Sequence, residues 1–484
     1  MAIRELHEKL KNRSISAIEL TESYLDRINE RDNVINSYIT VCRENALNEA
    51  KEAQKRLDAG DDNILLGIPY SVKDNICTKD IKTTCASRML EDFVPVYNAT
   101  VADRLKASGA VMLGKSNMDE FAMGGSSQTS YFGRVKNPYD ISRVAGGSSG
   151  GAAAGVAADL CLFGIGSDTG GSVRQPSAFC GVTGIKPTYG AVSRYGLIAF
   201  ASSLDQIGVS AMTAEDCAIV LDSICGIDKK DATSSDKAMG NYTALIGTSL
   251  KGKKVGILKE FFGDGISDEV KKAVLDAAEF YKDAGCELVE LSMPSLKYAV
   301  SAYYLISSSE AASNLSRFDG IKYGIREGDN ASYEELVRKT RSRGFGEEVK
   351  RRILLGNYAL SSGYYDAYYN NASRIRGKIA DEYNDIFKKC DVILTPTAPT
   401  TAYQATQRNE SPVSMYLMDI CTVTANLAGI PAISTPCGYD SNGMPIGMSI
   451  VGRAFAEAEI IAFCAAYESE FERIEANIRK DKTK

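Results

Sequence analysis

Two glycine- and serine-rich stretches decide how this sequence is interpreted: "VAGGSSGGAA" at residues 144–153 and "SDTGGSVRQP" at residues 167–176. Both place serine beside glycine, as loops that present a nucleophile do. The 484-residue chain holds one histidine, His7, whereas a Ser-His-Asp triad needs an imidazole between the serine and the carboxylate. His7 lies far from both stretches, among apolar residues in a pattern typical of a half-buried helix residue. An attacking serine would therefore need another base.

Lysine is the alternative base that the sequence offers. An ordinary lysine has a pKa near 10.4 and is protonated at neutral pH, but burial or a neighbouring cation lowers that pKa. Lys73 ends the apolar segment "IPYSVKD", and Lys186 lies in "GIKPTYG". Each could instead be a strand-end lysine that reaches solvent, so the residues alone leave both candidates open.

The glycines of "DTGGS", residues 168–172, have a chemical use. Attack on an amide creates an oxyanion, which backbone N–H groups stabilise when they are aimed at one point. Glycine lets consecutive N–H groups converge and lets a substrate approach the backbone. Thr169, Gly170 and Gly171 are therefore predicted to form an oxyanion hole in front of a nucleophile at Ser172. A phosphate-binding loop and a tight structural turn are the alternatives, although "GIGSDTGG" only approaches the pattern G-x-G-x-x-G.

The surrounding sequence predicts an α/β fold, because short apolar runs alternate with helical patterns along the chain. Buried strands are predicted at residues 70–74, 110–114, 161–168, 181–188, 390–399 and 430–438. The first fifty residues predict helices, one of them opened by a capping box at Ser16 and Glu19. Further helices are predicted at 152–159 and 457–474, and residues 252–291 predict a strand–helix–strand unit with Ser267 as N-cap and Gly285 as the C′ residue.

The bulk composition is ordinary for a globular protein, with 44% hydrophobic and 24% charged residues. The formal net charge of −6 argues against broad nucleic-acid binding by this chain alone, although a partner could still hold a nucleic acid. Twelve scattered cysteines without a C-x-x-C pattern favour buried thiols over disulfides or a zinc site. The charged start and the absence of a long apolar run predict a cytoplasmic protein with no membrane span.

Three segments together resemble the amidase signature family: "GIPYSVKDN" at residues 67–75, "GGSSGGAAAGVAA" at 146–158 and "SDTGGSVRQPSAFCGVTGIKPTYG" at 167–190. The resemblance implies a single large α/β domain over residues 1–484. It also implies a mixed central β-sheet flanked by helices on both faces, with the catalytic core within residues 65–210. No composition break marks a domain boundary, which agrees with that expectation.

The same resemblance implies a Ser–cis-Ser–Lys triad. Ser172 would be the acylated nucleophile, and Ser148 would be the bridging serine that follows a cis peptide bond. Lys73 would be the base: it takes a proton from Ser148, which takes one from Ser172. This arrangement would supply the base that the missing histidine leaves open.

Four further segments resemble the branch of the family that hydrolyses glutamine for tRNA-dependent amidotransferases: residues 115–133, 137–151, 193–208 and 416–434. That resemblance implies that ammonia passes to a B subunit, which amidates mischarged Glu-tRNA(Gln) or Asp-tRNA(Asn) with ATP and Mg²⁺, while a C subunit bridges the other two. It implies no metal or cofactor in this chain. A stand-alone amidase for a small amide and a scaffold subunit with a dead site are the alternatives.

Glutamine carries an ammonium and a carboxylate, so its pocket needs an anion and a cation. By resemblance, Asp419 would hold the ammonium, Arg352 rather than Arg351 the carboxylate, and Tyr303 would line the pocket. The sequence departs from the family pattern at Gly125, Gln128, Ala145 and Ala152. Of these, Gln128 is expected near the pocket, where it could alter glutamine affinity and gating.

A tyrosine-rich segment, "SSGYYDAYYNNASRI" at residues 361–375, carries pairs of rings at the i, i+4 spacing of a helix. The tyrosines are Tyr364, Tyr365, Tyr368 and Tyr369. Core packing is the first interpretation of this pattern. A surface that meets the B subunit is the second, because tyrosine is enriched at interfaces.

Overall fold

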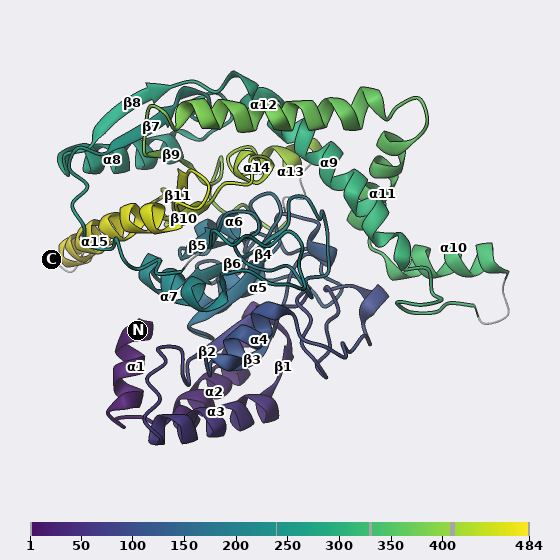
Figure 1. Cartoon of the computed structure of the whole chain (residues 1–484), viewed down its shortest axis with the longest axis horizontal. Helices are drawn as coiled ribbons and strands as arrows, with labels where there is room; N and C mark the ends of the chain where they lie inside the picture. The colour runs from purple at the N-terminus through teal and green to yellow at the C-terminus, as the bar shows by residue number, and fades with distance from the viewer. Residues whose placement is uncertain (1, 239, 329–331, 407–411, 483–484) are drawn as a thin grey trace.

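The protein is described by a computed structural model over residues 2–238, 240–328, 332–406 and 412–482 (Figure 1). Within these residues one eleven-stranded sheet has the strand order β1-β3-β2-β4-β6-β5-β10-β11-β9-β7-β8. The strands are β1 Tyr38–Val41, β2 Pro69–Lys73, β3 Val111–Ser116, β4 Phe163–Asp168, β5 Thr183–Lys186, β6 Gln206–Ala211, β7 Lys254–Leu258, β8 Glu287–Leu291, β9 Val392–Pro396, β10 Ala432–Tyr439 and β11 Pro445–Gly452. Parallel and antiparallel pairs both occur, which confirms the predicted mixed α/β sheet.

Helices cover the sheet on both faces. Every residue of the central strands β2, β4, β5 and β6 is buried, and successive side chains point to opposite faces of a strand. The helices are α1 Ile3–Lys11, α2 Ala17–Ile35, α3 Arg43–Asp58, α4 Thr100–Ala107, α5 Gly150–Ala157, α6 Arg174–Phe179, α7 Ala214–Ile224, α8 Asp268–Asp283, α9 Ala299–Asn314, α10 Tyr333–Gly344, α11 Glu347–Leu360, α12 Asn371–Ile386, α13 Pro412–Leu417, α14 Val423–Leu427 and α15 Glu457–Lys482.

The centre of the sheet brings distant segments to one edge. Strand β2 pairs in parallel with both β3 and β4, so the three carboxyl ends, at Lys73, Ser116 and Asp168, lie at the same edge of the sheet. The "DTGGS" loop leaves β4 there, and α5 begins directly after the serine pair of the first glycine-rich stretch. The sheet thereby places both glycine-rich stretches beside the end of β2.

Small residues allow α5 to lie close against the sheet. A Cβ atom added to Gly164 would stand 2.8 Å from the Cβ of Ala152, and one added to Gly166 would stand 2.9 Å from the Ser149 Oγ. Neither distance leaves room for a side chain. The glycines of β4 are therefore required by the close approach of helix and strand.

Local signals in the sequence are confirmed at several helix ends. Ser16 and Glu19 form the predicted capping box of α2. Ser267 caps α8 through a hydrogen bond from the Val270 N–H, and Gly285 has φ +91° just beyond its C-terminus. The β7–α8–β8 unit has its two strands paired in parallel.

Two sequence-based expectations are wrong. The first fifty residues are not all helical, because β1 pairs antiparallel with β3 at the sheet edge; a four-residue strand is too short to show a period of its own. The tyrosine-rich segment is not core, since Tyr364 and Tyr365 are more than 40% exposed and Tyr368 and Tyr369 are partly exposed. Their rings pack on one another instead, with centroids 5.9 Å apart for Tyr364–Tyr368 and 5.3 Å for Tyr365–Tyr369.

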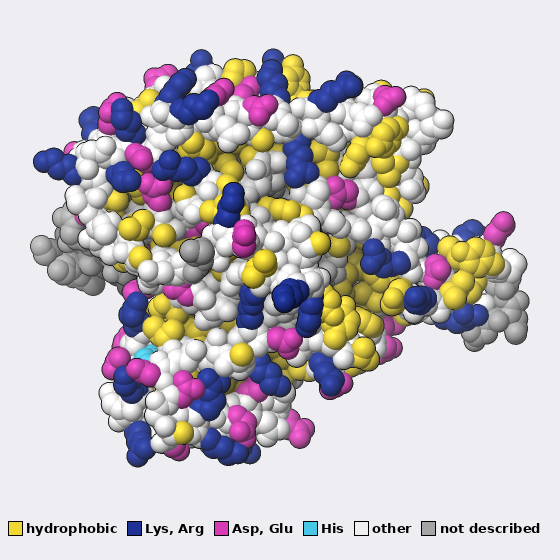
Figure 2. Space-filling view, viewed as in Figure 1, with side chains coloured by type: hydrophobic (Ala, Val, Ile, Leu, Met, Phe, Trp, Pro, Cys, Tyr) yellow, Lys and Arg dark blue, Asp and Glu magenta, His cyan; other side chains and the backbone are white. Residues whose placement is uncertain are grey.

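On the face drawn in Figure 2, basic and acidic side chains are interspersed over most elements. None of the described helices is long and apolar enough to cross a membrane. All twelve cysteines are free thiols, and ten of them are buried, in agreement with the expectation from their spacing.

Candidate active site

The side chain of Lys73 is enclosed where β2 ends. Lys73 has no exposed surface, and its Nζ donates to the Oγ atoms of Ser148 and Ser149, each at 2.8 Å, and to the Ser167 Oγ at 2.9 Å. The Ser167 carbonyl oxygen is a further acceptor at 3.2 Å. The structure thus brings the predicted base into direct contact with the serine pair of the first glycine-rich stretch.

Burial lowers the pKa of Lys73 to about 7. The carboxylates of Asp119, Asp168 and Asp205 act in the opposite direction, but the loss of hydration has the larger effect. A substantial fraction of the amine is therefore uncharged near neutral pH, as a general base requires.

The two serines bound to Lys73 differ in their other partners. The Gly147–Ser148 peptide bond is cis, as the resemblance implies. The Ser149 hydroxyl also donates to the Ser167 carbonyl, 3.1 Å away, and accepts from the Ser167 N–H. It is therefore hydrogen-bonded to the backbone of β4. The Ser148 hydroxyl makes no second hydrogen bond within the described part of the chain. Ser148 is therefore the serine left able to receive a proton.

Alanine substitutions should separate these two hydroxyls. Ser148→Ala is expected to lower kcat by roughly 10³-fold, because it breaks a proton-transfer step. Ser149→Ala removes only a supporting hydrogen bond and is expected to cost roughly tenfold or less. Turnover of the two purified variants decides the matter: equal losses, or a greater loss for Ser149→Ala, would reassign the bridging role.

The predicted nucleophile Ser172 lies in the loop between β4 and α6. Its side chain is buried but retains slight exposure, and its carbonyl oxygen accepts a hydrogen bond from the Ser149 N–H, 3.0 Å away. No hydrogen bond joins the hydroxyls of Ser172 and Ser148 in the described structure. The step from Ser172 to Ser148 therefore stays a prediction, whereas Lys73 and Ser148 are in contact.

An anion at Asp168 holds the loop on both sides of Ser172. Its carboxylate accepts the N–H groups of Gly171 at 2.8 Å and Val173 at 3.1 Å, and the Arg174 Nε lies 3.0 Å away. Burial alone would raise the pKa of Asp168, but the Arg174 guanidinium, together with the Lys186 charge and the Asn426 hydrogen bond, outweighs it and holds that pKa well below its ordinary value. Arg174 in turn donates to Asn426.

Asp168, Arg174 and Asn426 were not predicted as site residues. One signal was present: Asp168 and Arg174 are opposite charges six residues apart inside a segment that is otherwise small and uncharged. Such a pair is most easily accommodated when buried and mutually bonded. The partner Asn426 comes from a remote segment of the chain and has no local signal.

The backbone of the "DTGGS" loop leaves part of the predicted oxyanion hole available. The Gly171 N–H is bound by Asp168, while the N–H groups of Thr169 and Gly170 have no acceptor among the described residues. Gly171 has φ +132°, and a Cβ added there would stand 2.3 Å from the Thr422 Oγ1. Glycine is thus required at position 171 by both conformation and space.

The three residues predicted to bind glutamine lie around this loop. The Tyr303 ring covers Gly170 so closely that an added Cβ would stand 2.4 Å from the ring Cζ. Asp419 accepts a hydrogen bond from the Tyr304 hydroxyl at 2.6 Å, and burial raises the pKa of this carboxyl to about 7. Arg352 is buried on α11 and its charge acts on both Asp419 and Tyr303.

Arg351, the other arginine weighed for the carboxylate, is exposed. Both arginines pair with Glu348, Arg352 through its Nε at 2.6 Å. Of the two arginines only Arg352 is buried, and its role toward a substrate carboxylate stays a prediction. Neither Tyr304 nor Glu348 was predicted from the sequence.

The other candidates lie outside this cluster. Lys186 donates to the carbonyl oxygens of Pro187 and Ile430, and not to either serine stretch. The His7 Nε2 lies 3.1 Å from Asp62 at the N-terminal end of the fold. Of the candidate bases Lys73, Lys186 and His7, only Lys73 contacts the serines.

The four departures from the family pattern have separate surroundings. The Gln128 Nε2 donates to the Ala405 carbonyl at 2.9 Å. Gly125 faces Asp419, with an added Cβ 3.9 Å from its Oδ1. Ala145 and Ala152 are buried. Of the four positions, position 125 is therefore the one where a side chain would contact Asp419.

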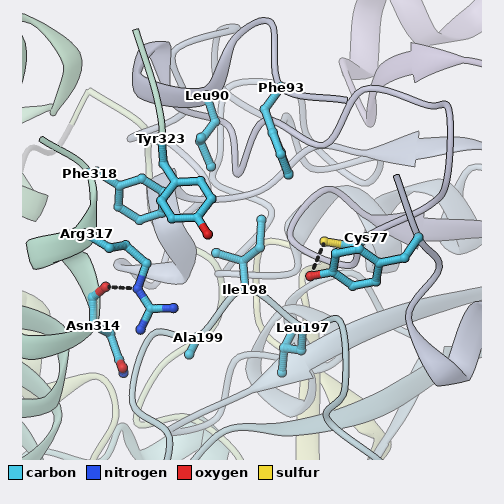
Figure 3. Close-up of a pocket in the computed structure, with 11 residues that line it drawn as sticks. Cys77, Leu90, Phe93, Leu197, Ile198, Ala199, Asn314, Arg317, Phe318 and Tyr323 are labelled. Carbon is cyan, nitrogen blue, oxygen red and sulfur yellow. Dashed lines mark hydrogen bonds between the residues drawn. The ribbon is translucent and has the colours of Figure 1, made fainter. Parts of the chain in front are cut away.

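A separate cavity of about 190 Å³ lies at the end of α9 (Figure 3). Its lining combines apolar side chains such as Leu90, Phe93 and Ile198 with the polar Asn314 and Arg317. None of the predicted site residues lines it. The cavity is therefore distinct from the Lys73 cluster. Among the described residues, no group of His, Cys, Asp and Glu side chains could hold a metal ion.

Known proteins match this chain over nearly its whole length. The amidase family profile matches residues 19–461. The A subunit of glutamyl-tRNA(Gln) amidotransferase from Ruminiclostridium cellulolyticum is 55% identical over 472 residues, which cover 97% of each chain. The protein of the same name from Thermoanaerobacter pseudethanolicus is 52% identical over 468 residues, covering 97% of this chain and 96% of the relative.

Two solved structures extend the comparison. The crystal structure of the A subunit of glutamyl-tRNA(Gln) amidotransferase from Thermotoga maritima matches with a TM-score of 0.78 and 39% identity, covering 96% of this chain and 93% of that chain. The native peptide amidase from Stenotrophomonas maltophilia matches with a TM-score of 0.82 and 29% identity, covering 97% and 96%.

Proposed function

The chain belongs to the amidase family, and from that membership we propose that it is the glutamine-hydrolysing A subunit of a tRNA-dependent amidotransferase. One observation carries the proposal: the buried Lys73, with a pKa of about 7, contacts Ser148 and Ser149. The Asp419 carboxylate and the Arg352 guanidinium lie near the neighbouring loop. The lysine and serines suit amide hydrolysis, and the two charges suit a substrate with an ammonium and a carboxylate. The two amidotransferase A subunits named above match nearly the whole chain.

The reaction proceeds through an ester on Ser172. Lys73 accepts the Ser148 proton while Ser148 accepts that of Ser172, and the Ser172 oxygen attacks the side-chain amide carbon of glutamine. The N–H groups of Thr169 and Gly170 stabilise the oxyanion. The C–N bond breaks as the leaving nitrogen takes the proton back, which releases ammonia. Water then cleaves the ester, so glutamine and water give glutamate and ammonia.

Asp419 and Arg352 hold the two ends of the amino acid. The substrate ammonium binds the Asp419 carboxylate, and its carboxylate binds Arg352. Tyr303, which lies over Gly170, closes the pocket between them. These contacts place the side-chain amide at the loop.

The ammonia is used by a partner. We assign amidation of Glu-tRNA(Gln) or Asp-tRNA(Asn) to a B subunit that binds ATP and Mg²⁺, with a C subunit bridging the two, and we place the complex in the cytoplasm. The tRNA would contact mainly the B subunit. Residues 1–484 would act as one amidase domain, with the catalytic core within residues 65–210.

The proposal is tested by ammonia release. The chain is purified alone and co-expressed with its B and C subunits, and ammonia from glutamine is measured in each preparation. Release that requires Ser172 and is stimulated by the partners supports the proposal. Full activity of the lone chain on neutral amides, with none on glutamine, would instead identify a stand-alone amidase, and no activity in either preparation would identify a scaffold.

Asp419→Ala tests substrate class separately. The substitution removes the counter-charge of the ammonium, so kcat/KM for glutamine is expected to fall by roughly 10²-fold or more. Hydrolysis of a neutral amide such as propionamide should change little, because it offers no ammonium. An equal loss of kcat/KM on both amides would show that Asp419 supports the fold or the chemical step and does not bind the substrate ammonium.

A further inference from the structure

Two consecutive tyrosines of α9 face the proposed glutamine site from different directions. Tyr303 covers Gly170, and the neighbouring Tyr304 ring stands edge-on to it, with centroids 5.0 Å apart and an interplanar angle of 83°. The Tyr304 hydroxyl donates to the Asp419 Oδ2 at 2.6 Å. Tyr304 is only 6% exposed, so this hydrogen bond is shielded from water.

The ring of Tyr304 also meets the guanidinium. The Arg352 Cζ lies 4.5 Å from the Tyr304 ring centroid and 5.0 Å from that of Tyr416. The two rings stack on each other, with centroids 3.8 Å apart and an angle of 23°. A guanidinium over aromatic faces gains a cation–π attraction that is largest where water is excluded.

Glu348 completes the far side of this arrangement. Its Oε1 accepts from the Arg352 Nε at 2.6 Å and from the Tyr416 hydroxyl at 3.4 Å. Arg352 is therefore held by one carboxylate at Nε and by the rings of Tyr304 and Tyr416, with the Phe200 ring centroid 5.9 Å from its Cζ. None of these contacts uses Asp419, whereas Tyr304 contacts both Arg352 and Asp419.

We propose that Tyr304, with Tyr416 stacked on it, is a positioning residue that ties the ammonium-binding carboxylate to the carboxylate-binding guanidinium as one unit. This inference rests on the proposed function, since it assumes that Asp419 and Arg352 hold the two ends of glutamine. A fixed distance between the two charges selects an amide that carries both an ammonium and a carboxylate on one carbon. The tyrosine hydroxyl sets that distance at the Asp419 end, and the ring sets it at the Arg352 end.

The hydroxyl also favours the charged form of Asp419. Burial raises the pKa of Asp419, whereas the Tyr304 hydrogen bond and the charge of Arg352 lower it. The groups that face Asp419 are Tyr303 and Tyr304 from α9, Arg352 from α11, Asp168 and Arg174 from the β4–α6 segment, and Cys421 from its own segment. Without the hydroxyl, the carboxyl protonates at a higher pH and loses its hold on the ammonium.

The test uses the complex with its partner subunits and two variants of Tyr304. Tyr304→Phe removes the hydroxyl and keeps the stack, so KM for glutamine is expected to rise by roughly ten- to a hundred-fold, while kcat at about pH 8.5 stays within about twofold. The pH below which KM rises should move upward relative to the unmodified chain. Tyr304→Leu removes the ring as well, so KM should rise further and the discrimination against a neutral amide should shrink.

Tyr281→Phe is the matched control. Tyr281 is a buried tyrosine of α8 whose hydroxyl donates to the Phe463 carbonyl at 2.9 Å, away from the site. This variant should leave KM and its pH dependence unchanged. If Tyr304→Phe leaves KM and its pH dependence unchanged, or lowers kcat alone, the positioning role is wrong although glutamine hydrolysis stands. If the unmodified complex does not hydrolyse glutamine, the proposed function itself fails.

Discussion

A Ser172→Ala variant, assembled with its partner subunits, is expected to release ammonia from glutamine roughly 10⁴- to 10⁶-fold more slowly than the unmodified complex. The substitution removes the oxygen that would form the ester, so only direct attack by water remains. The loop itself should survive, because Asp168 holds it through the N–H groups of Gly171 and Val173 and not through the serine side chain. Single-turnover ammonia release and a circular-dichroism melting curve measure the two effects.

A glutamine analogue that acylates or alkylates the nucleophile provides the direct readout. Mass spectrometry of the labelled, digested chain should place the adduct on the peptide that contains Ser172. Ser177→Ala is the control, since Ser177 is a buried serine of the neighbouring α6 bonded to the Ser210 hydroxyl at 2.9 Å, and it should label as the unmodified chain does. An adduct on another serine, or persistent turnover by Ser172→Ala, would contradict the assignment.

Lys73→Met should inactivate the chain and change how its stability depends on pH. Removing the base is expected to lower kcat by roughly 10²- to 10⁴-fold. In the unmodified chain, kcat should fall as pH drops below about 7, because the amine with that pKa becomes protonated. Methionine has a similar length and no charge, so the variant keeps the core filled.

The sign of the Lys73 pKa shift fixes the direction of the stability effect. The folded pKa is about 7, below the ordinary value near 10.4, so the unfolded chain binds more protons between these two values. The free energy of unfolding of the unmodified chain should therefore rise, relative to Lys73→Met, by roughly 1.4 kcal/mol per pH unit between about pH 7 and 10. Below about pH 7 the difference should be constant.

Urea unfolding of both chains at several pH values from about 6 to 9 measures that difference. Lost hydrogen bonds to the serines shift the whole curve of the variant but do not alter the slope of the difference. Parallel curves above neutral pH would mean that the amine is equally protonated in the folded and unfolded chains. Lys73 would then carry a proton at the pH of the reaction and could not act as the base.

Much of the central sheet follows from the sequence because its strands are short apolar runs bounded by glycine or proline. Strands β2, β3, β4, β5, β9 and β10 fall within or beside the predicted segments. Strands β1, β6 and β11 were not predicted. The first is a four-residue edge strand, and "QIGVSA" and "PIGMSIVG" have too little alternation to separate a strand from a turn.

Only part of the candidate site could be predicted from the sequence. Lys73, Ser148 and Ser172 stand in local motifs that can be recognised in the sequence alone. The residues that contact the site from other parts of the chain have no such motif. Tyr304 stands among ordinary helix residues, and only the folded structure shows that it contacts both Asp419 and Arg352. The tyrosines after α11 were predicted to be core and are exposed. A helical spacing of large rings does not reveal whether another element packs against them.

The parallel arrangement of β3, β2 and β4 has a consequence for the moment at which a newly made chain becomes reactive. The amine at position 73 and the alcohol at position 172 meet only after strands that are far apart in the sequence have paired. Before that, the amine is hydrated, keeps its proton and is inert toward amides. A chain in which these strands have not yet paired consequently cannot hydrolyse glutamine, because pairing both buries the amine and brings it to the serines.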